Sequence, residues 1–258
     1  MRTLGLIGGL SWESTAIYYR LLNEGVRDRL GGLHSAQLLL WSFDFATVDA
    51  RQAVDDWDGL ATVMVETAQR LEQAGADAVL ICANTMHRVA EHVAARIEVP
   101  LIHIADAAAV VINKTPCRRP ALLATRYTME QDFYRDRLRD RHGIDAIVPD
   151  AGGRHLVHQI IFDELCRGIV SPASKQVLVE QVGLLRERGA DGLILGCTEV
   201  GLILSQSDFS VPVFDTALLH VDAALKFLCP DASVASSQRD GAQAATTPSA
   251  TKRSISGS

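Results

Sequence analysis

The segments Gly75-Ala76-Asp77-Ala78-Val79-Leu80-Ile81 and Gly189-Ala190-Asp191-Gly192-Leu193-Ile194-Leu195 match each other without a gap, at an offset of 114 residues (75 to 189). Each follows a helical pattern and runs from a glycine into a short apolar stretch, which is typical of a buried strand in a parallel sheet. Two further pairs keep the same order, Val99–Ile102 with Val211–Phe214 and Leu4–Ile7 with Ala121–Ala124. The three pairs predict an internal repeat, and therefore two similar lobes facing each other.

Around these segments, short apolar strands alternate with longer helical patterns, which predicts βα units and mostly parallel sheets. Strands are expected at 4–7, 38–41, 78–82, 101–104, 121–124, 146–148, 193–195 and 211–214. Helices are expected from Ser11, a candidate N-cap, and at 57–73, 85–96, 129–141, 155–165, 174–187 and 217–228. The predicted fold class is α/β, with two pseudo-symmetric flavodoxin-like lobes, each a mostly parallel sheet flanked by helices.

The repeat also predicts how the chain divides into domains. An N-terminal lobe is expected at residues 1–113 and a C-terminal lobe at 114–214, with the last helix, at about 215–228, returning to the first lobe. After Cys229-Pro230 the residues are mainly Ala, Ser, Thr and Gln, and large apolar side chains are almost absent. Such a segment buries too little surface to order itself, so we expect 229–258 to be a disordered tail.

Composition narrows the classes of partner and the compartment. The 258 residues carry a net charge of −6 and are 48% hydrophobic, so no basic surface for nucleic acid or for an anionic membrane is expected. The apolar runs are too short to span a bilayer. Five cysteines without framework spacing indicate reduced thiols, and a strand begins directly after Met1-Arg2-Thr3. We therefore expect a cytoplasmic protein without a signal peptide.

Polar residues follow the repeated strands in both halves. Ligands of open parallel sheets bind beyond the carboxyl ends of the strands, where the first half has Cys82-Ala83-Asn84-Thr85 and the second has Gly196-Cys197-Thr198-Glu199. At each strand-to-helix turn, backbone N–H groups favour an anion. Cys197 is the strongest candidate for a reactive thiol, and the start of the following helix is expected to lower its pKa.

With these motifs the sequence resembles the PLP-independent aspartate/glutamate racemases, and among them the broad-specificity amino-acid racemases. The resemblance covers about residues 3–228 and rests on four motifs, Gly8–Thr15, Asn84-Thr85-Met86-His87, Thr125–Glu130 and Gly196–Glu199. It implies an isomerase that needs no cofactor and acts on a small amino acid of the aspartate or glutamate type. One cysteine thiolate removes the α-proton and a second thiol returns a proton from the other face. The resemblance also implies a possible homodimer.

One half of this two-cysteine pattern is missing. The family's first cysteine comes immediately before the Asn-Thr pair, where this chain has Ala83, and the offset of 114 likewise pairs Ala83 with Cys197. Cys82 lies one position earlier and is expected to point into the core, because neighbouring strand residues face opposite sides. We expect slow or one-handed racemisation. A one-base lyase or decarboxylase, as in the related arylmalonate decarboxylases, and a non-catalytic amino-acid-binding protein are the alternatives.

Further residues are expected to bind the substrate. Asn84, Thr85 and Thr198 are candidates for holding the α-carboxylate and ammonium groups, and Thr125 and Thr128 for lining the cleft. By the resemblance, Arg51 and Gln52 lie in a loop that contacts the distal group of the substrate. Arg51 could pair with a side-chain carboxylate there, with a solvated arginine as the alternative.

Other candidate sites are weaker. Relatives specific for aspartate carry a second basic residue near Cys166-Arg167, where the match is ambiguous. Cys117, Cys166 and Cys229 are expected to be structural. His155 and His158 have helical spacing but no completing ligands, so no metal site is expected.

Overall fold

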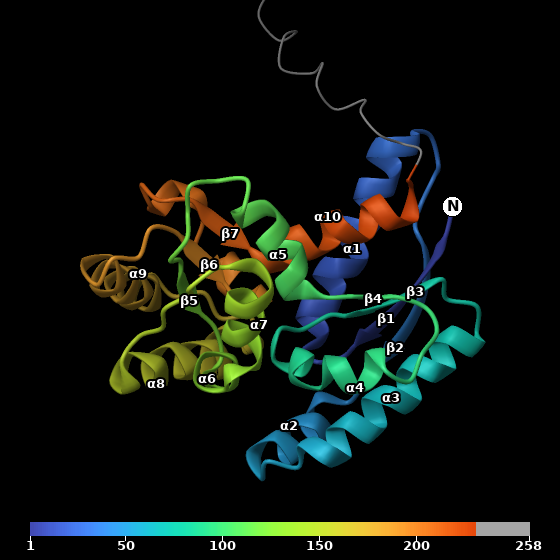
Figure 1. The fold of residues 1–258 in the computed structure, drawn as a ribbon, viewed down its shortest axis with the longest axis horizontal. Coiled ribbons are helices and arrows are strands. Elements are labelled where there is room, and N and C mark those ends of the chain that lie inside the picture. The colour runs from blue at the N-terminus through green and yellow to red at the C-terminus, as the bar shows by residue number, and fades with distance from the viewer. Residues whose placement is uncertain (231–258) are drawn as a thin grey trace, which may run out of the picture.

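The computed structural model describes residues 1–230. The tail predicted at 229–258 therefore falls almost wholly outside the described residues. Two parallel sheets form the centres of two lobes (Figure 1), with strand orders β2-β1-β3-β4 and β5-β6-β7. The predicted α/β class with parallel sheets flanked by helices is confirmed.

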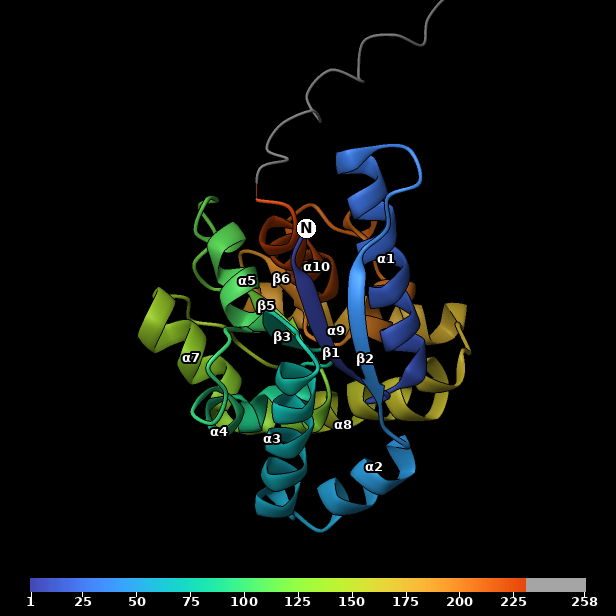
Figure 2. The ribbon, with the colours of Figure 1, turned by 90° about the vertical axis from the view of Figure 1, so that its right-hand side faces the viewer.

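The first sheet consists of β1 (Thr3–Gly8), β2 (Gln37–Ser42), β3 (Ala78–Ile81) and β4 (Leu101–Ile102), all paired in parallel. Alternate strand residues face opposite sides. Leu4 and Leu6 pack with α1 (Trp12–Leu30) and α10 (Thr216–Leu228). Ile7 packs on the other side, against α3 (Trp57–Gln73) and α4 (Ala90–Ala94). Helix α2 (Phe45–Ala53) joins β2 to α3 at the lower end of this lobe (Figures 1 and 2).

The second sheet consists of β5 (Ala121–Leu123), β6 (Leu193–Leu195) and β7 (Val213–Asp215). The strand expected at 146–148 is reduced to a single bridge between Ile147 and Ala121. The core of the second lobe includes side chains of α7 (Asp132–His142), α8 (Ala151–Gln159) and α9 (Pro172–Glu187). The helix expected at 129–141 is divided, because Gln131 has an extended backbone between α6 (Arg126–Glu130) and α7.

The predicted internal repeat is visible in the backbone. Gly75 and Gly189, 114 residues apart, both have positive φ, at 97° and 93°. The aspartate two residues later plays the same part in each lobe. Asp77 accepts a 2.7 Å hydrogen bond from the N–H of Thr3, and Asp191 accepts one of 2.8 Å from the N–H of Arg118. Each aspartate thus ties the turn before one strand to the start of its neighbour.

The two lobes exchange one helix each. Helix α10 follows the second sheet but packs against the first lobe, where Ala217, Val221 and Leu225 join the core beside α1. Helix α5 (Ile104–Ile112) follows the first sheet, yet its buried side chains belong to the core of the second lobe. Figure 1 shows α5 beside α10, between the lobes. The apolar face of α10 thus packs with the first lobe and that of α5 with the second, so the packing does not divide at the predicted boundary of residue 113.

Candidate active site

A cavity of about 40 Å³ lies where the turns after β1, β3, β5 and β6 meet. The carboxyl ends of parallel strands share one edge of a sheet, so the two lobes bring these turns together. Seven of the residues predicted from the sequence line the cavity: Gln52, Ala83, Asn84, Thr85, Thr125, Cys197 and Thr198. Gly9 shapes the first turn at a φ of 71°, where any Cβ would lie 2.2 Å from the backbone of Phe43.

Cys197 is the residue predicted to supply the reactive thiol. Its side chain is 8% exposed, and its Sγ donates a 2.9 Å hydrogen bond to Oε2 of Glu199. Thr198 Oγ1 donates to the same oxygen at 2.6 Å. Burial, and then the negative charge of Glu199, raise the pKa of Cys197 well above its ordinary value. The expected lowering by a helix start is therefore wrong, because Thr198–Leu202 is only a five-residue 3-10 turn, and burial together with the carboxylate of Glu199 outweighs it.

Ala83 and Cys82 point in opposite directions. Ala83 lines the cavity, whereas Cys82 is fully buried in the core between the first sheet and α1 and α10. This burial raises the pKa of the Cys82 thiol far above its ordinary value. The register expected from the repeat is therefore observed, and the second cysteine that lines the cavity is Cys166.

Asn84 is held in one orientation. Thr216 Oγ1 donates to the carbonyl of Leu195 at 2.7 Å, so this hydroxyl must accept from Asn84, whose Nδ2 lies 3.0 Å away. The amide oxygen of Asn84 therefore points away from Thr216. It is buried, and within residues 1–230 it has no hydrogen-bond partner. A buried acceptor without a donor costs free energy unless a ligand supplies one, so Asn84 is suited to bind an ammonium group.

Three threonine hydroxyls meet between the lobes. Thr85 Oγ1 lies 2.8 Å from Oγ1 of Thr125 and 3.3 Å from Oγ1 of Thr128. Thr85 comes from the first lobe and the other two from the second, so the triad joins the lobes at the edge of the cavity. Thr128 is fully buried and is not among the lining residues. Its contact with the site runs through Thr85 and Thr125.

Arg51 and Gln52 lie on helix α2 rather than in the predicted loop. Successive residues of a helix point about 100° apart, so the two side chains diverge. Gln52 is 3% exposed and lines the cavity, with Nε2 3.2 Å from the sulfur of Met86. Arg51 is exposed and pairs with Asp56 at 3.3 Å. Arg51 is not among the lining residues, so the solvated alternative holds in this structure.

Sequence reasoning missed the apolar part of the site. Leu10 follows the glycine turn of β1, while Phe45, Met86 and the adjacent pair Ile161 and Phe162 come from three further segments. Cys166, expected to be structural, also lines the cavity. Ile161 and Phe162 belong to a π-helical turn at Ile160–Glu164 that continues α8, a distortion frequent at functional sites. Cys166 lies in the 3-10 turn that follows it. Sequence periodicity does not reveal such a turn.

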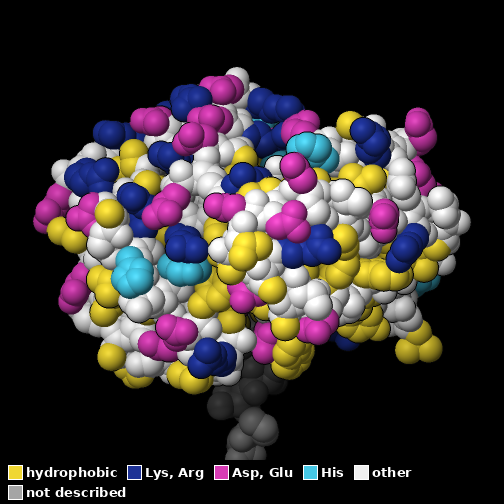
Figure 3. Space-filling view, turned by 90° about the horizontal axis from the view of Figure 1, so that it is seen from below, with side chains coloured by type: hydrophobic (Ala, Val, Ile, Leu, Met, Phe, Trp, Pro, Cys, Tyr) yellow, Lys and Arg dark blue, Asp and Glu magenta, His cyan; other side chains and the backbone are white. Residues whose placement is uncertain are grey.

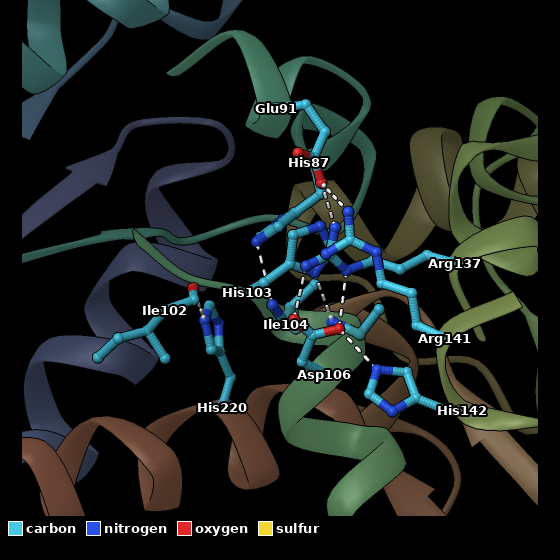
Figure 4. Close-up of polar contacts among 11 residues, drawn as sticks. His87, Glu91, Ile102, His103, Ile104, Asp106, Arg137, Arg141, His142 and His220 are labelled. Atoms are coloured by element: carbon cyan, nitrogen blue, oxygen red, sulfur yellow. Dashed lines mark hydrogen bonds and ion pairs between the residues drawn. The ribbon is translucent and has the colours of Figure 1, made fainter. Parts of the chain in front are cut away.

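Behind the site lies a cluster of buried histidines (Figure 4). His87 Nδ1 lies 2.7 Å from the carbonyl oxygen of Ala83, and its Nε2 accepts from the N–H of Ile104 at 3.1 Å. The ring of His103 packs 4.5 Å from that of His87, and the ring of His220 packs 5.6 Å from it. Desolvation lowers the pKa of all three well below the ordinary histidine value. His87 is therefore neutral and braces the turn that carries Ala83.

The surface adds little chemistry of its own. Figure 3 shows Lys and Arg interspersed with Asp and Glu on the lower face of the molecule, without a patch of one sign. Within residues 1–230, no helix is long and apolar enough to cross a bilayer. In the same part of the chain, no group of three or more His, Cys, Asp or Glu side chains is placed to hold a metal ion.

Comparisons with known proteins agree with this geometry. The family model of the Asp/Glu/hydantoin racemases matches residues 7–224. A Yersinia pestis structure provisionally assigned as an Asp/Glu racemase is 47% identical, with a TM-score of 0.83 over 88% of this chain and 99% of that one. An aspartate racemase homologue from Pyrococcus horikoshii OT3 is 34% identical, with a TM-score of 0.77 and the same coverage.

A curated relative points the same way. The broad specificity amino-acid racemase RacX of Bacillus subtilis is 23% identical over 173 residues, which are 63% of this chain and 69% of that protein. The family match spans both lobes and all of the cavity's lining residues. The chain therefore belongs to the Asp/Glu/hydantoin racemase family of isomerases.

Proposed function

We propose that this protein is a cofactor-independent amino-acid racemase in which Cys197 is the acid–base group on one face of the substrate. The observation that carries the proposal is the hydrogen bond from the Cys197 thiol to Glu199 at the wall of the interlobe cavity. A thiol must lose its proton to act as a base. Glu199 is an acceptor within hydrogen-bond reach, so the proton has a place to go.

Substrate binding follows from the remaining polar groups. The unpartnered amide oxygen of Asn84 accepts from the α-ammonium group of the amino acid. Two short helical turns, Thr85–Val89 and Thr198–Leu202, begin at the cavity from opposite lobes. The first N–H groups of a helical turn lack partners within the turn, so they are suited to bind the α-carboxylate. This orientation leaves the Cα–H bond between the Cys197 side and the Ala83 side.

The proposed reaction starts with transfer of the thiol proton from Cys197 to Glu199. The thiolate then takes the proton from Cα, and the electron pair of the broken C–H bond moves into the carboxylate to form an enolate. Return of a proton from Cys197 restores the starting enantiomer. A proton delivered by water on the Ala83 side gives the other enantiomer, and the hydroxide left behind takes the proton held by Glu199, which restores the thiol–carboxylate pair.

Because position 83 has no thiol, proton transfer is expected to be slower on the Ala83 face of the substrate than on the Cys197 face. One positioned general acid–base group typically contributes about 10²–10⁴ in rate. Water replaces that group on the Ala83 side, so inversion is slower than exchange of the α-proton. The neighbouring Thr85 hydroxyl is engaged by Thr125 and Thr128, which leaves it poorly placed to deliver a proton.

The methyl group of Ala83 also favours a second candidate function, a one-base decarboxylation. A substituted malonate loses one carboxylate as CO₂, and the electron pair stays on Cα as an enolate. Cys197 then protonates that carbon from its own side, and no group is needed on the other side. Because only one acid–base face is required, the product is a single enantiomer.

Proton NMR of an L-amino acid in D₂O, followed by chiral chromatography, tests the proposal. The proposed racemase replaces the Cα proton with deuterium and forms the D-enantiomer more slowly than it exchanges. Exchange without any inversion, together with decarboxylation of a substituted malonate, indicates the one-base lyase. Binding without exchange at Cα, for every amino acid tried, contradicts catalysis and indicates a binding protein.

A further inference from the structure

Five of the residues that line the cavity have large apolar side chains. Leu10, Phe45 and Met86 come from the first lobe, and Ile161 and Phe162 from the second. Phe45 and Phe162 pack across the interlobe boundary, with ring centroids 6.3 Å apart. These five side chains form an apolar part of the lining that cannot pair with a charge.

Cations are absent from this lining. None of the lining residues of the described chain is a lysine, arginine or histidine. Arg51, expected near the distal group of the substrate, pairs with Asp56 at 3.3 Å, and Arg167, where the match to a second basic residue is ambiguous, pairs with Asp163 at 3.8 Å. The position beside Arg167 that lines the cavity is Cys166, and burial keeps its thiol neutral by raising its pKa.

The charge already present works in the same direction. Glu199 is 3% exposed, and its carboxylate accepts side-chain hydrogen bonds from two neutral groups, Cys197 and Thr198. An acidic amino acid would bring a second buried carboxylate near Glu199 with no cation to compensate it. Leaving a charged group without a partner in a buried site costs more than the roughly 1–3 kcal/mol of a neutral polar group.

We infer that the site selects an amino acid with an uncharged, apolar side chain rather than aspartate or glutamate. The inference rests on the proposed function for the identity of the cavity as the amino-acid site. Asn84 and the two turn N–H sets receive the ammonium and carboxylate groups common to all amino acids, while the wall of Leu10, Phe45, Met86, Ile161 and Phe162 receives the side chain. Gln52 also lines the cavity, and its Nε2 is directed at the sulfur of Met86.

Binding to the Cys197→Ala variant tests the side-chain preference without any chemistry. Isothermal titration calorimetry should give dissociation constants for L-2-aminobutyrate and L-methionine at least about 100-fold lower than those for L-aspartate and L-glutamate. In the same background, Cys166→Arg places a cation on the wall and should tighten aspartate binding about tenfold or more. The inference is overturned if the Cys197→Ala variant without the second substitution binds aspartate as tightly as methionine, or more tightly. It is also overturned if that variant binds no neutral amino acid.

The matched control is Arg51→Ala, since Arg51 is the cation that the sequence places nearest the distal group. The ratio of methionine to aspartate binding should stay within about twofold, and a selective tenfold loss of aspartate binding would overturn the inference. Failure of the proposed function looks different. If the wild-type protein binds methionine tightly but exchanges no Cα proton, racemisation is contradicted while the side-chain preference stands.

Discussion

Sγ of Cys197 lies 2.9 Å from Oε2 of Glu199, two residues further along the same turn. Both side chains are buried, and the carboxylate raises the pKa of the thiol beyond what burial alone does. The pair therefore rests as a neutral thiol beside a base, and the thiolate forms only when its proton moves to Glu199 or to solvent. The first prediction tests this relationship.

Glu199→Gln should lower the rate of Cα exchange by about 10²–10⁴, because glutamine cannot take the thiol proton. The same substitution removes a negative charge beside the thiol, so the pKa of Cys197 should fall toward its ordinary value while remaining raised by burial. Thiolate absorbance at 240 nm against pH measures this shift, with Cys197→Ala as the blank. An unchanged titration would show that Glu199 does not act on the thiol.

Ala83→Cys should add an acid–base group on the face opposite Cys197. Formation of the D-enantiomer should rise by up to about 10²–10⁴, with Cα exchange changing much less. Cys82→Ala is the matched control, since Cys82 lies in the core and should cost only about 1 kcal/mol of stability. If Cys82→Ala stops exchange and Ala83→Cys does nothing, the assignment of the two positions is reversed.

Asn84→Ala should raise KM about tenfold or more with a smaller effect on kcat, because the acceptor for the ammonium group is lost. Thr216→Val serves as a comparison. It removes the hydroxyl that orients Asn84 but keeps the acceptor, so its effect on KM should be smaller. Equal effects of the two variants would mean that orientation, rather than the amide oxygen, matters.

The buried histidines predict how stability depends on pH. Desolvation lowers the pKa of His220 to about 4, against about 6.5 in the unfolded chain. As pH falls below about 6.5 the unfolded state binds this proton first, so stability is complete above that value and is lost progressively toward pH 4. At pH 5 the lowered pKa of His220 reduces the free energy of unfolding by about 2 kcal/mol relative to neutral pH.

His220→Gln should therefore flatten the pH dependence. Glutamine can still donate to the carbonyl of Ile102 and accept from Tyr18, the two partners of the histidine ring, without taking up a proton. Urea unfolding at pH 7.5 and pH 5 should show the wild type losing about 2 kcal/mol more than the variant. The same loss in both proteins would place the acid-labile groups elsewhere.

The repeat and the strand ends could be predicted from the sequence because they depend on local pattern. The helix expected at 57–73 and the strand expected at 193–195 have the observed bounds of α3 and β6. Helix α3 has a helical period of apolar residues, and β6 is a short apolar run between Gly192 and Gly196. The offset between the lobes pairs Ala83 with Cys197, and both line the cavity, because alternation along a strand leaves little freedom in register.

The parts that could not be predicted depend on tertiary packing. Helix α5 has apolar residues on most sides and reads as a continuation of β4, so nothing in its pattern predicts that the second lobe buries it. The sequence pattern predicts a loop where the structure has helix α2, and a loop gives no reason for the side chains of Arg51 and Gln52 to point in different directions. The raised pKa of Cys197 likewise depends on burial and on the orientation of Glu199. Those are properties of the folded site.

The most direct test of the account is deuterium exchange at Cα by Cys197→Ala, measured beside Cys117→Ala. Cys117 is buried in the second lobe, where its thiol donates to Asp191, and it does not line the cavity. We predict that Cys197→Ala loses at least about 10²-fold in exchange rate, with an unchanged circular dichroism spectrum and retained amino-acid binding, while Cys117→Ala exchanges at the wild-type rate. Exchange by Cys197→Ala at the wild-type rate would contradict the assignment of this thiol as the acid–base group.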